Sequence, residues 1–182
     1  MTTRRAAFLD RDGVLNRAIV RNGRPYAPRH LAEFEILPEA AGAVARLTAA
    51  GLLTIVVTNQ PDVARGLVTH ATLDEMHRRL RDAMRLDDIR ICIGQDGCAC
   101  YKPKPGMLLE AARAWDIDLQ GSVMIGDRWR DVGAGRAAGC RTVFVDRGYA
   151  ERLIDRPDFT VGDVAEAAAL VVAGLPARGS AS

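Results

Sequence analysis

Residues 6–16 read AAFLDRDGVLN, an apolar run that ends in two acidic side chains one residue apart. The run at residues 6–9 predicts a buried strand, and Asp10 and Asp12 stand directly after it. Neighbouring carboxylates repel each other unless a cation lies between them. This stretch therefore predicts a sheet whose first strand ends at a cation site.

Four further apolar runs have the β-branched character of buried parallel strands, at residues 52–57, 89–92, 122–126 and 141–145. Helical patterns alternate with them: one runs between Pro38 and Gly51, and a second begins with a capping box of Thr72 and Glu75. A third follows Pro105, and a fourth, rich in small residues, ends at Gly139. The order predicts an α/β fold, a doubly wound, Rossmann-like parallel sheet of about five strands with helices on both faces.

Composition favours one compact domain, because 48% of the 182 residues are hydrophobic. We expect this domain over residues 1–176 and a frayed tail at 177–182, the final residues "ARGSAS". A formal charge of +2 offers no basic stripe, so nucleic-acid binding is not favoured. No apolar run approaches the roughly 20 residues of a membrane span, and the first ten residues lack the apolar segment of a secretory signal. We therefore expect a cytoplasmic protein without a membrane partner.

Polar residues follow the predicted strands where a parallel sheet binds its ligands. Asp10 follows the first run, Thr58 and Asn59 the second and Asp127 the fourth, while the segment after the third carries Lys102. Carboxylates from two strands beside a lysine and a hydroxyl suit Mg²⁺ and a phosphoryl group. In an extended segment Asp10 and Asp12 would point the same way, so that one carboxylate could attack phosphorus while the other protonates the leaving group.

Other interpretations of these residues carry different weight. A calcium-binding EF-hand loop is excluded, because Gly13 comes too early and Arg21 stands where a glutamate is needed. Aspartate pairs are common in surface turns, and "TNQ" at 58–60 could be a polar turn. Asp131 could cap a helix, hold a water or contact the metal. Spacing alone does not choose between Lys102 and Lys104.

Four segments in order, "FLDRDGVLN", "VVTNQ", "CACYKPKPGM" and "MIGDRWRDVGAGRAAG", resemble the motifs of the haloacid dehalogenase superfamily of phosphohydrolases. They are most similar to the branch of heptose-bisphosphate and histidinol-phosphate phosphatases, which lacks a large cap domain. The resemblance implies a nucleophile at Asp10, a general acid and base at Asp12 and phosphate contacts at Thr58 and Asn59. It also implies Lys102, rather than Lys104, as the charge-neutralising lysine, and a Mg²⁺ site made by Asp10, Asp127 and the carbonyl of Asp12.

Two departures from that branch concern its zinc loop and its substrate. Three cysteines close together in the sequence suit a metal better than a disulfide framework. The loop is short and has no histidine, however, so a zinc ion would need Asp96 or water as its fourth ligand. A zinc site that had lost its function would show the same residues. These cysteines are Cys92, Cys98 and Cys100. Tyr101 stands where the heptose enzymes generally have arginine, so the arginine contact to a second phosphate of the substrate is in question. Arg65 or Arg128 could bind that phosphate instead. Cys140 is expected in the core.

We expect a monomeric, Mg²⁺-dependent phosphatase that acts through an aspartyl-phosphate on a small phosphorylated sugar. A heptose bisphosphate is the first expectation for the substrate, and histidinol phosphate is the alternative. A phosphate-binding protein without turnover is the alternative from another class, and the intact Asp10 and Asp12 argue against it. A nucleic-acid 3′-phosphatase has little support from the charge balance.

Overall fold

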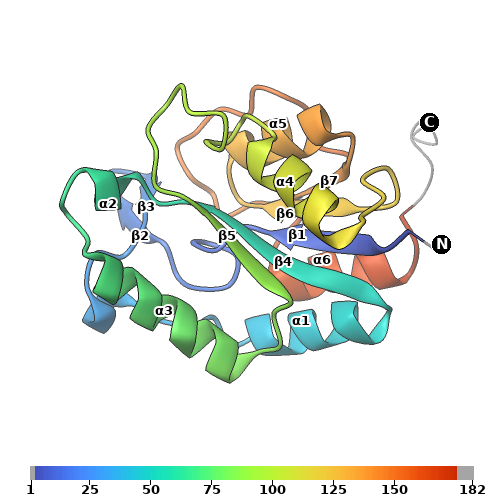
Figure 1. Ribbon diagram of the computed structural model, residues 1–182, viewed down its shortest axis with the longest axis horizontal. Helices are drawn as coiled ribbons and strands as arrows, with labels where there is room; N and C mark the ends of the chain where they lie inside the picture. The colour runs from blue at the N-terminus through green and yellow to red at the C-terminus, as the bar shows by residue number, and fades with distance from the viewer. Residues whose placement is uncertain (1–2, 176–182) are drawn as a thin grey trace.

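The centre of the protein is a six-stranded parallel sheet in the computed structural model, which describes residues 3–175 (Figure 1). The strand order is β5-β4-β1-β6-β7-β8, with β1 at Arg5–Leu9, β4 at Leu52–Asn59, β5 at Asp88–Cys92, β6 at Val123–Gly126, β7 at Arg141–Val145 and β8 at Phe159–Val161. The predicted fold class and its five strands are confirmed, and β8 is an addition. Because the chain adds strands on both sides of β1, the carboxyl end of β1 lies at the switch point where such sheets bind ligands.

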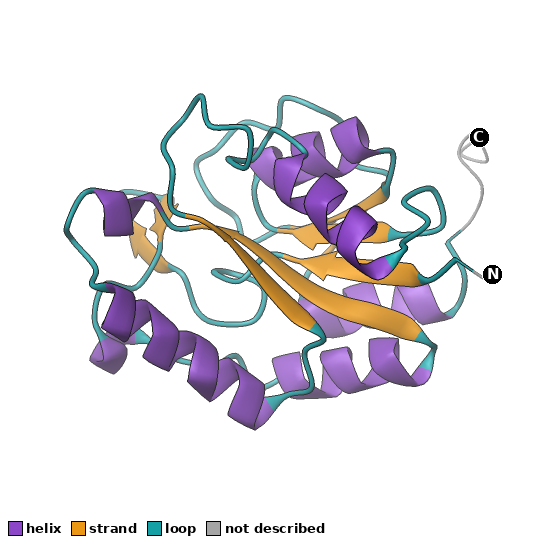
Figure 2. Cartoon of the chain, in the orientation of Figure 1, coloured by secondary structure: helices purple, strands orange, loops and turns teal. Residues whose placement is uncertain are grey.

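Helices cover both faces of the sheet, as Figure 2 shows. On one face lie α1 (Ala40–Ala49), α3 (His70–Ala83) and α6 (Val164–Val172), and on the other lie α4 (Gly106–Trp115) and α5 (Trp129–Ala138). Each face has its own buried apolar cluster, so the sheet is the shared wall between two cores. Shorter helical segments are η1 (Leu31–Glu33) and α2 (Pro61–Ala64).

The start of α3 differs from the sequence prediction. The cap is Thr69, whose hydroxyl oxygen accepts the backbone amide of Thr72 at 3.1 Å. Thr72 is therefore already inside the first turn, and the predicted capping box of Thr72 and Glu75 is wrong. Glu75 instead pairs with Arg78 at 2.7 Å, one turn along the helix.

A hairpin of β2 (Ile19–Arg21) and β3 (Arg24–Tyr26) stands apart from the main sheet. Asn22 and Gly23 form its turn with φ angles of 51° and 72°, the positive values that a two-residue hairpin turn needs. The hairpin contributes residues to the cavity at the carboxyl edge of the sheet.

No helix in the part of the chain that the structure describes is long and apolar enough to cross a membrane. The tail predicted at residues 177–182 lies outside the described residues.

Candidate active site

Three aspartates meet at the carboxyl edge of the sheet. Asp10 follows β1, Asp127 follows β6, and Asp131 lies in the first turn of α5. Each offers a carboxylate oxygen within 4.8 Å of the other two, and all three residues are buried. The backbone amide of Asp10 donates to the carbonyl of Ile125 at 2.9 Å, which ties the end of β1 to β6. The strand ends therefore bring together the carboxylates of Asp10 and Asp127 that the sequence predicted would meet.

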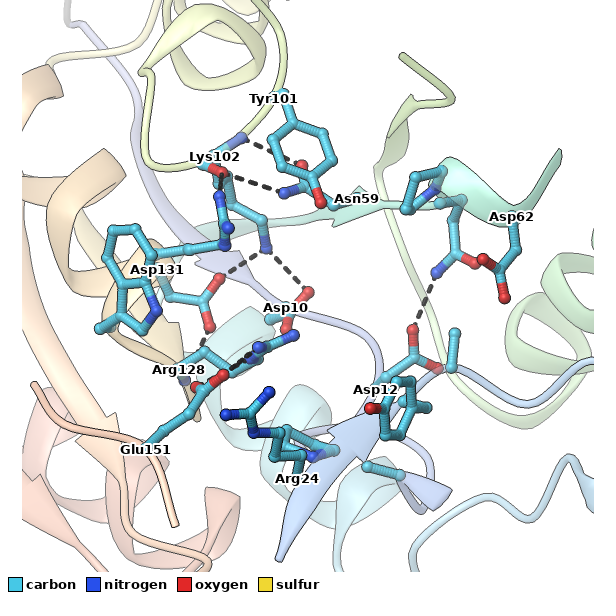
Figure 3. Close-up of a pocket in the computed structure, with 18 of the residues that line it drawn as sticks. Asp10, Asp12, Arg24, Asn59, Asp62, Tyr101, Lys102, Arg128, Asp131 and Glu151 are labelled. Carbon is cyan, nitrogen blue, oxygen red and sulfur yellow. Dashed lines mark hydrogen bonds and ion pairs between the residues drawn. The ribbon is translucent and has the colours of Figure 1, made fainter. Parts of the chain in front are cut away.

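Lys102 supplies the positive charge of this cluster (Figure 3). Its Nζ donates to Oδ1 of Asp10 at 2.8 Å, to Oδ1 of Asp131 at 2.6 Å and to the carbonyl of Val57 at 2.8 Å. Burial disfavours its charge, but the two carboxylates outweigh burial and raise the pKa of Lys102. Lys104, by contrast, is exposed and its Nζ contacts the carbonyl of Gly97. Of the two lysines, Lys102 is therefore the one at the carboxylates.

The carboxylate cluster carries more negative charge than Lys102 can balance. Burial and then Asp131 raise the pKa of Asp10 to about 6, although Lys102 opposes the rise. Burial, followed by Asp10 and Asp131, raises the pKa of Asp127 well above its usual value, and the nearby Tyr149 hydroxyl only partly opposes this. Among the residues that the structure describes, neither carboxylate oxygen of Asp127 has a hydrogen-bond partner of standard geometry, and both are buried. Buried carboxylates of this kind fit a divalent cation.

Two glycines allow these carboxylates to lie so close to the backbone. A Cβ at Gly13 would lie 1.8 Å from Oδ2 of Asp127, and one at Gly126 would lie 2.2 Å from Cβ of Asp131. Any side chain at either position would displace an aspartate of the cluster. Asp131 also accepts the backbone amide of Arg128 at 3.0 Å, so it caps α5 and binds Lys102 at the same time.

Asp12 lines the same cavity as Asp10 but is held by different partners. Its carboxylate accepts hydrogen bonds from Arg11 at 2.9 Å, Asn16 at 2.9 Å and Gln60 at 2.8 Å. Figure 3 shows Asp12 across the cavity from Asp131, with Asp10 between them. Asp12 therefore lies near the cluster with its carboxylate oriented independently of Lys102.

A buried pair behind Asp12 was not found by sequence reasoning. Arg11 is fully buried, and its guanidinium lies 3.2 Å from Nε2 of His77 on α3. Burial, and then the charge of Arg11, lowers the pKa of His77 to about 3. A neutral His77 can accept a hydrogen bond from Arg11, which in turn holds Asp12. His77 shares the buried face of α3 with Leu73, Met76 and Leu80. This helical spacing is the feature of the sequence that could have indicated a buried histidine.

Thr58 and Asn59, the expected phosphate contacts, both bond to protein groups. The hydroxyl oxygen of Thr58 accepts from Gln60 at 2.9 Å, and Thr58 is not among the described residues that line the cavity. Asn59 donates to the carbonyl of Lys102 at 3.1 Å and accepts its amide at 3.0 Å. In this structure Asn59 therefore fixes the backbone of Lys102, and Gln60, missed in the sequence, links Thr58 to Asp12.

Tyr101 and Arg128 line the cavity, which has a volume of about 520 Å³. The Tyr101 ring lies 5.2 Å from the guanidinium carbon of Arg130. Arg128 is paired through two nitrogens with the carboxylate of Glu151. The charge of Arg128 is thus already neutralised by a neighbour.

The cysteine loop departs from the prediction that it suits a metal better than a disulfide. Cys92 and Cys100 form a disulfide, with their Cα atoms 5.5 Å apart, so that expectation is wrong for this pair. The short loop folds back at Gly94, where a Cβ would lie 2.9 Å from Cβ of Cys98. Cys98 stays free with its sulfur 3.1 Å from that of Cys100, so the three sulfurs do lie together. Asp96 is exposed and contacts Arg130 at 3.9 Å. Cys140 is buried, as expected.

A Rossmann-like parallel sheet with aspartates and a buried lysine at its carboxyl edge defines a class of phosphoryl-transfer enzymes. Comparison with known proteins agrees. A family model described as HAD-hydrolase-like matches residues 99–167. The D-glycero-beta-D-manno-heptose-1,7-bisphosphate 7-phosphatase of Pseudomonas aeruginosa is 36% identical, over 85% of this chain and 88% of the relative. The enzyme of the same name from Bordetella bronchiseptica is 38% identical, over 81% and 83% of the two chains.

A solved structure gives the same result. The D,D-heptose 1,7-bisphosphate phosphatase of B. bronchiseptica, crystallised with magnesium and phosphate, superposes with a TM-score of 0.76 at 32% identity, over 93% of this chain and 98% of that one. The chain belongs to the heptose-bisphosphate phosphatase family of haloacid dehalogenase-like hydrolases, and it is a phosphatase.

Proposed function

We propose that this phosphatase removes the 7-phosphate of D-glycero-D-manno-heptose 1,7-bisphosphate with the help of Mg²⁺. The observation that carries the proposal is the buried cluster of Asp10, Asp127 and Asp131 with Lys102 between two of its carboxylates. The choice of substrate is supported by the relatives, which are named as heptose-1,7-bisphosphate 7-phosphatases. The magnesium and phosphate in the B. bronchiseptica structure support the choice of cofactor and reaction.

The residues present fit a magnesium ion. Both oxygens of Asp127 are buried and have no hydrogen-bond partner of standard geometry among the described residues, and Asp10 lies beside it. These two carboxylates, with the backbone carbonyl of Asp12, would hold the metal. Bound there, Mg²⁺ would neutralise charge on the phosphoryl oxygens. Asp131 has both oxygens engaged, by Lys102 and by the amide of Arg128, so we assign it to holding Lys102.

The reaction itself is assigned to Asp10 and Asp12. Oδ1 of Asp10 is held by Lys102, which leaves Oδ2 to attack phosphorus. The new bond gives an aspartyl-phosphate, and the bond from phosphorus to the sugar oxygen breaks while Asp12 gives that oxygen a proton. Asp12 then takes a proton from water, which attacks the phosphorus, releases inorganic phosphate and restores Asp10. Lys102 balances negative charge throughout.

The test compares nearly isosteric variants in a phosphate-release assay with heptose 1,7-bisphosphate, heptose 7-phosphate and histidinol phosphate. Asp10→Asn and Asp12→Asn should each lose about a thousandfold or more in kcat. Asp116→Asn is the matched control. Asp116 ends α4, and its carbonyl accepts the amide of Arg4 just before β1 begins, at the opposite end of that strand from Asp10. Its left-handed φ of 53° suits asparagine. It should retain full activity. Substantial turnover by Asp10→Asn would refute the mechanism, and a preference for histidinol phosphate would refute the substrate.

Several other expectations stay predictions. They are the single domain over residues 1–176, the monomeric state and the cytoplasmic location.

A further inference from the structure

The charges that line the active-site cavity are mostly paired. Lys102 is held by Asp10 and Asp131, and Arg128 by Glu151. Arg65 lies 3.3 Å from Asp62, and Arg130 lies 3.9 Å from Asp96. Two lining arginines differ: Arg24 and Arg152 have no ion pair with any described residue. Their positive charges are the ones that remain available to a ligand.

These two arginines come from segments that are bonded to each other. Arg24 lies on β3 in the hairpin, and Arg152 lies in the loop that follows β7. The amide of Ala150 donates to the carbonyl of Gly23 at 2.8 Å, and the approach is so close that a Cβ at Gly23 would lie 2.9 Å from Cβ of Ala150. The hairpin and the loop thus form one wall of the cavity, with an arginine from each.

The Arg24 side chain points into the cavity. Figure 3 shows its guanidinium directed toward the pair of Arg128 and Glu151, on the side of the cavity away from Tyr101. Both Arg24 and Arg152 are exposed, so a ligand in the cavity could reach them. A guanidinium offers a planar fork of donors that matches two oxygens of a phosphate.

We propose that Arg24, assisted by Arg152, is the specificity-determining residue that binds the phosphate which is not hydrolysed. This inference rests on the proposed function, because a bisphosphate brings a second dianion into the cavity. The first phosphate needs Lys102 and the carboxylate cluster, and the paired arginines have already been neutralised. The hairpin wall therefore takes over the contact that Tyr101 cannot make with a single hydroxyl.

Arg21 provides a matched control for Arg24. It lies opposite Arg24 in the register of the same hairpin, it is exposed, and it does not line the cavity. Its guanidinium carbon lies 5.9 Å from the Tyr26 ring. Arg21→Ala and Arg24→Ala thus remove the same charge from the same hairpin, and only the second removes it from the cavity.

The experiment measures kcat/KM for heptose 1,7-bisphosphate and heptose 7-phosphate on the native protein and both variants. Arg24→Ala should lower the ratio of bisphosphate to monophosphate by about 10- to 100-fold, the usual loss for a charge-assisted hydrogen bond. The loss should come mainly from KM, because the contact is made in the ground state as well as in the transition state. Arg152→Ala should shift the ratio in the same direction, and Arg21→Ala should leave it unchanged.

A binding measurement separates this inference from the proposed function. Titration calorimetry with heptose 1-phosphate, the product that keeps only the distal phosphate, needs no turnover. The subsite is supported if Arg24→Ala weakens binding of heptose 1-phosphate about tenfold or more and Arg21→Ala leaves it unaffected. That result would hold even if the native protein released no phosphate. Absence of phosphate release would refute the proposed function alone. Equal effects of the two variants on both the ratio and the binding would overturn the role of Arg24.

Discussion

Replacing Gly13 with alanine should disable the site through a single added methyl group. Gly13 has a φ of +87°, and a Cβ there would lie 1.8 Å from Oδ2 of Asp127 and 2.9 Å from the Tyr149 hydroxyl. Carbon normally stays about 3.5 Å from such an atom. The loop at Gly13 and the Asp127 carboxylate must therefore separate by roughly 1.7 Å, and Asp127 is buried among the other carboxylates.

Gly51→Ala is the matched control for the backbone. Gly51 has a φ of +79°, but a Cβ there would meet nothing within 4 Å. Both variants place alanine in the left-handed region, which costs about 1–2 kcal/mol of folding free energy. Only Gly13→Ala also displaces a carboxylate of the site, and a misplacement of about 1 Å can reduce the rate about a hundredfold.

The assay pairs urea unfolding with phosphate release in the presence of Mg²⁺. Gly51→Ala should lose about 1–2 kcal/mol of stability and keep its kcat/KM. Gly13→Ala should lose at least as much stability and also about a hundredfold or more in kcat/KM. If folded Gly13→Ala protein retained the kcat/KM of Gly51→Ala, the close approach of Gly13 to Asp127 could not be a requirement of the site.

Lys102→Met should destabilise the protein by about 3–5 kcal/mol in urea unfolding, because it leaves buried carboxylates without their cation, whereas Lys104→Met on the surface should have little effect. Native-like stability of Lys102→Met would contradict the buried ion pairs. Burial lowers the pKa of His77 in the folded protein to about 3, whereas a histidine in the unfolded chain has a pKa near 6.5. Between about pH 3 and pH 6.5 the unfolded chain therefore binds one proton more than the folded protein does. The unfolding free energy should therefore fall as the pH drops from 6.5 toward 3, by up to about 1.4 kcal/mol per pH unit, and His77→Gln should reduce this slope in unfolding curves at pH 7 and pH 5. Thiol titration of the denatured, unreduced protein should detect only Cys98 and Cys140, with less than one zinc per chain by elemental analysis; four thiols and stoichiometric zinc would contradict the disulfide.

The central sheet could be predicted because its longer strands are rich in apolar and β-branched residues, although β5 also carries Asp88 and Arg90. The strand β8 could not be predicted, because Phe159–Val161 has only three residues and includes a threonine, so no apolar run marks it. In the structure none of the three is fully buried. The hairpin did carry a signal, since Asn22 and Gly23 form the dipeptide most typical of a two-residue hairpin turn. The flanking strands, Ile19–Arg21 and Arg24–Tyr26, have only three residues each and are largely exposed, so no buried apolar run accompanies the turn.

From residue spacing alone, the site was predictable only where the sheet itself dictates position, and the choice of Lys102 over Lys104 rests on the family resemblance. Asp10 and Asp127 end neighbouring parallel strands, so the strand order alone brings them together. The contacts of Asn59 with Lys102 and of Arg11 with His77 join residues 43 and 66 positions apart. No periodicity in the sequence encodes such pairs, because they depend on how loops and a helix pack above the sheet edge.

The cluster also explains why a chain would end its first strand in acidic residues. Asp10, Asp127 and Asp131 are buried together, and Lys102 bonds to only two of them. The carboxylate that Lys102 does not reach, Asp127, has no hydrogen-bond partner of standard geometry among the described residues, and its pKa is raised well above its usual value. Folding thus places a carboxylate where its charge is disfavoured until a cation or a proton balances it. A divalent cation that binds only the folded chain would relieve this and stabilise the fold by mass action, so the same imbalance that weakens the empty fold would favour metal binding.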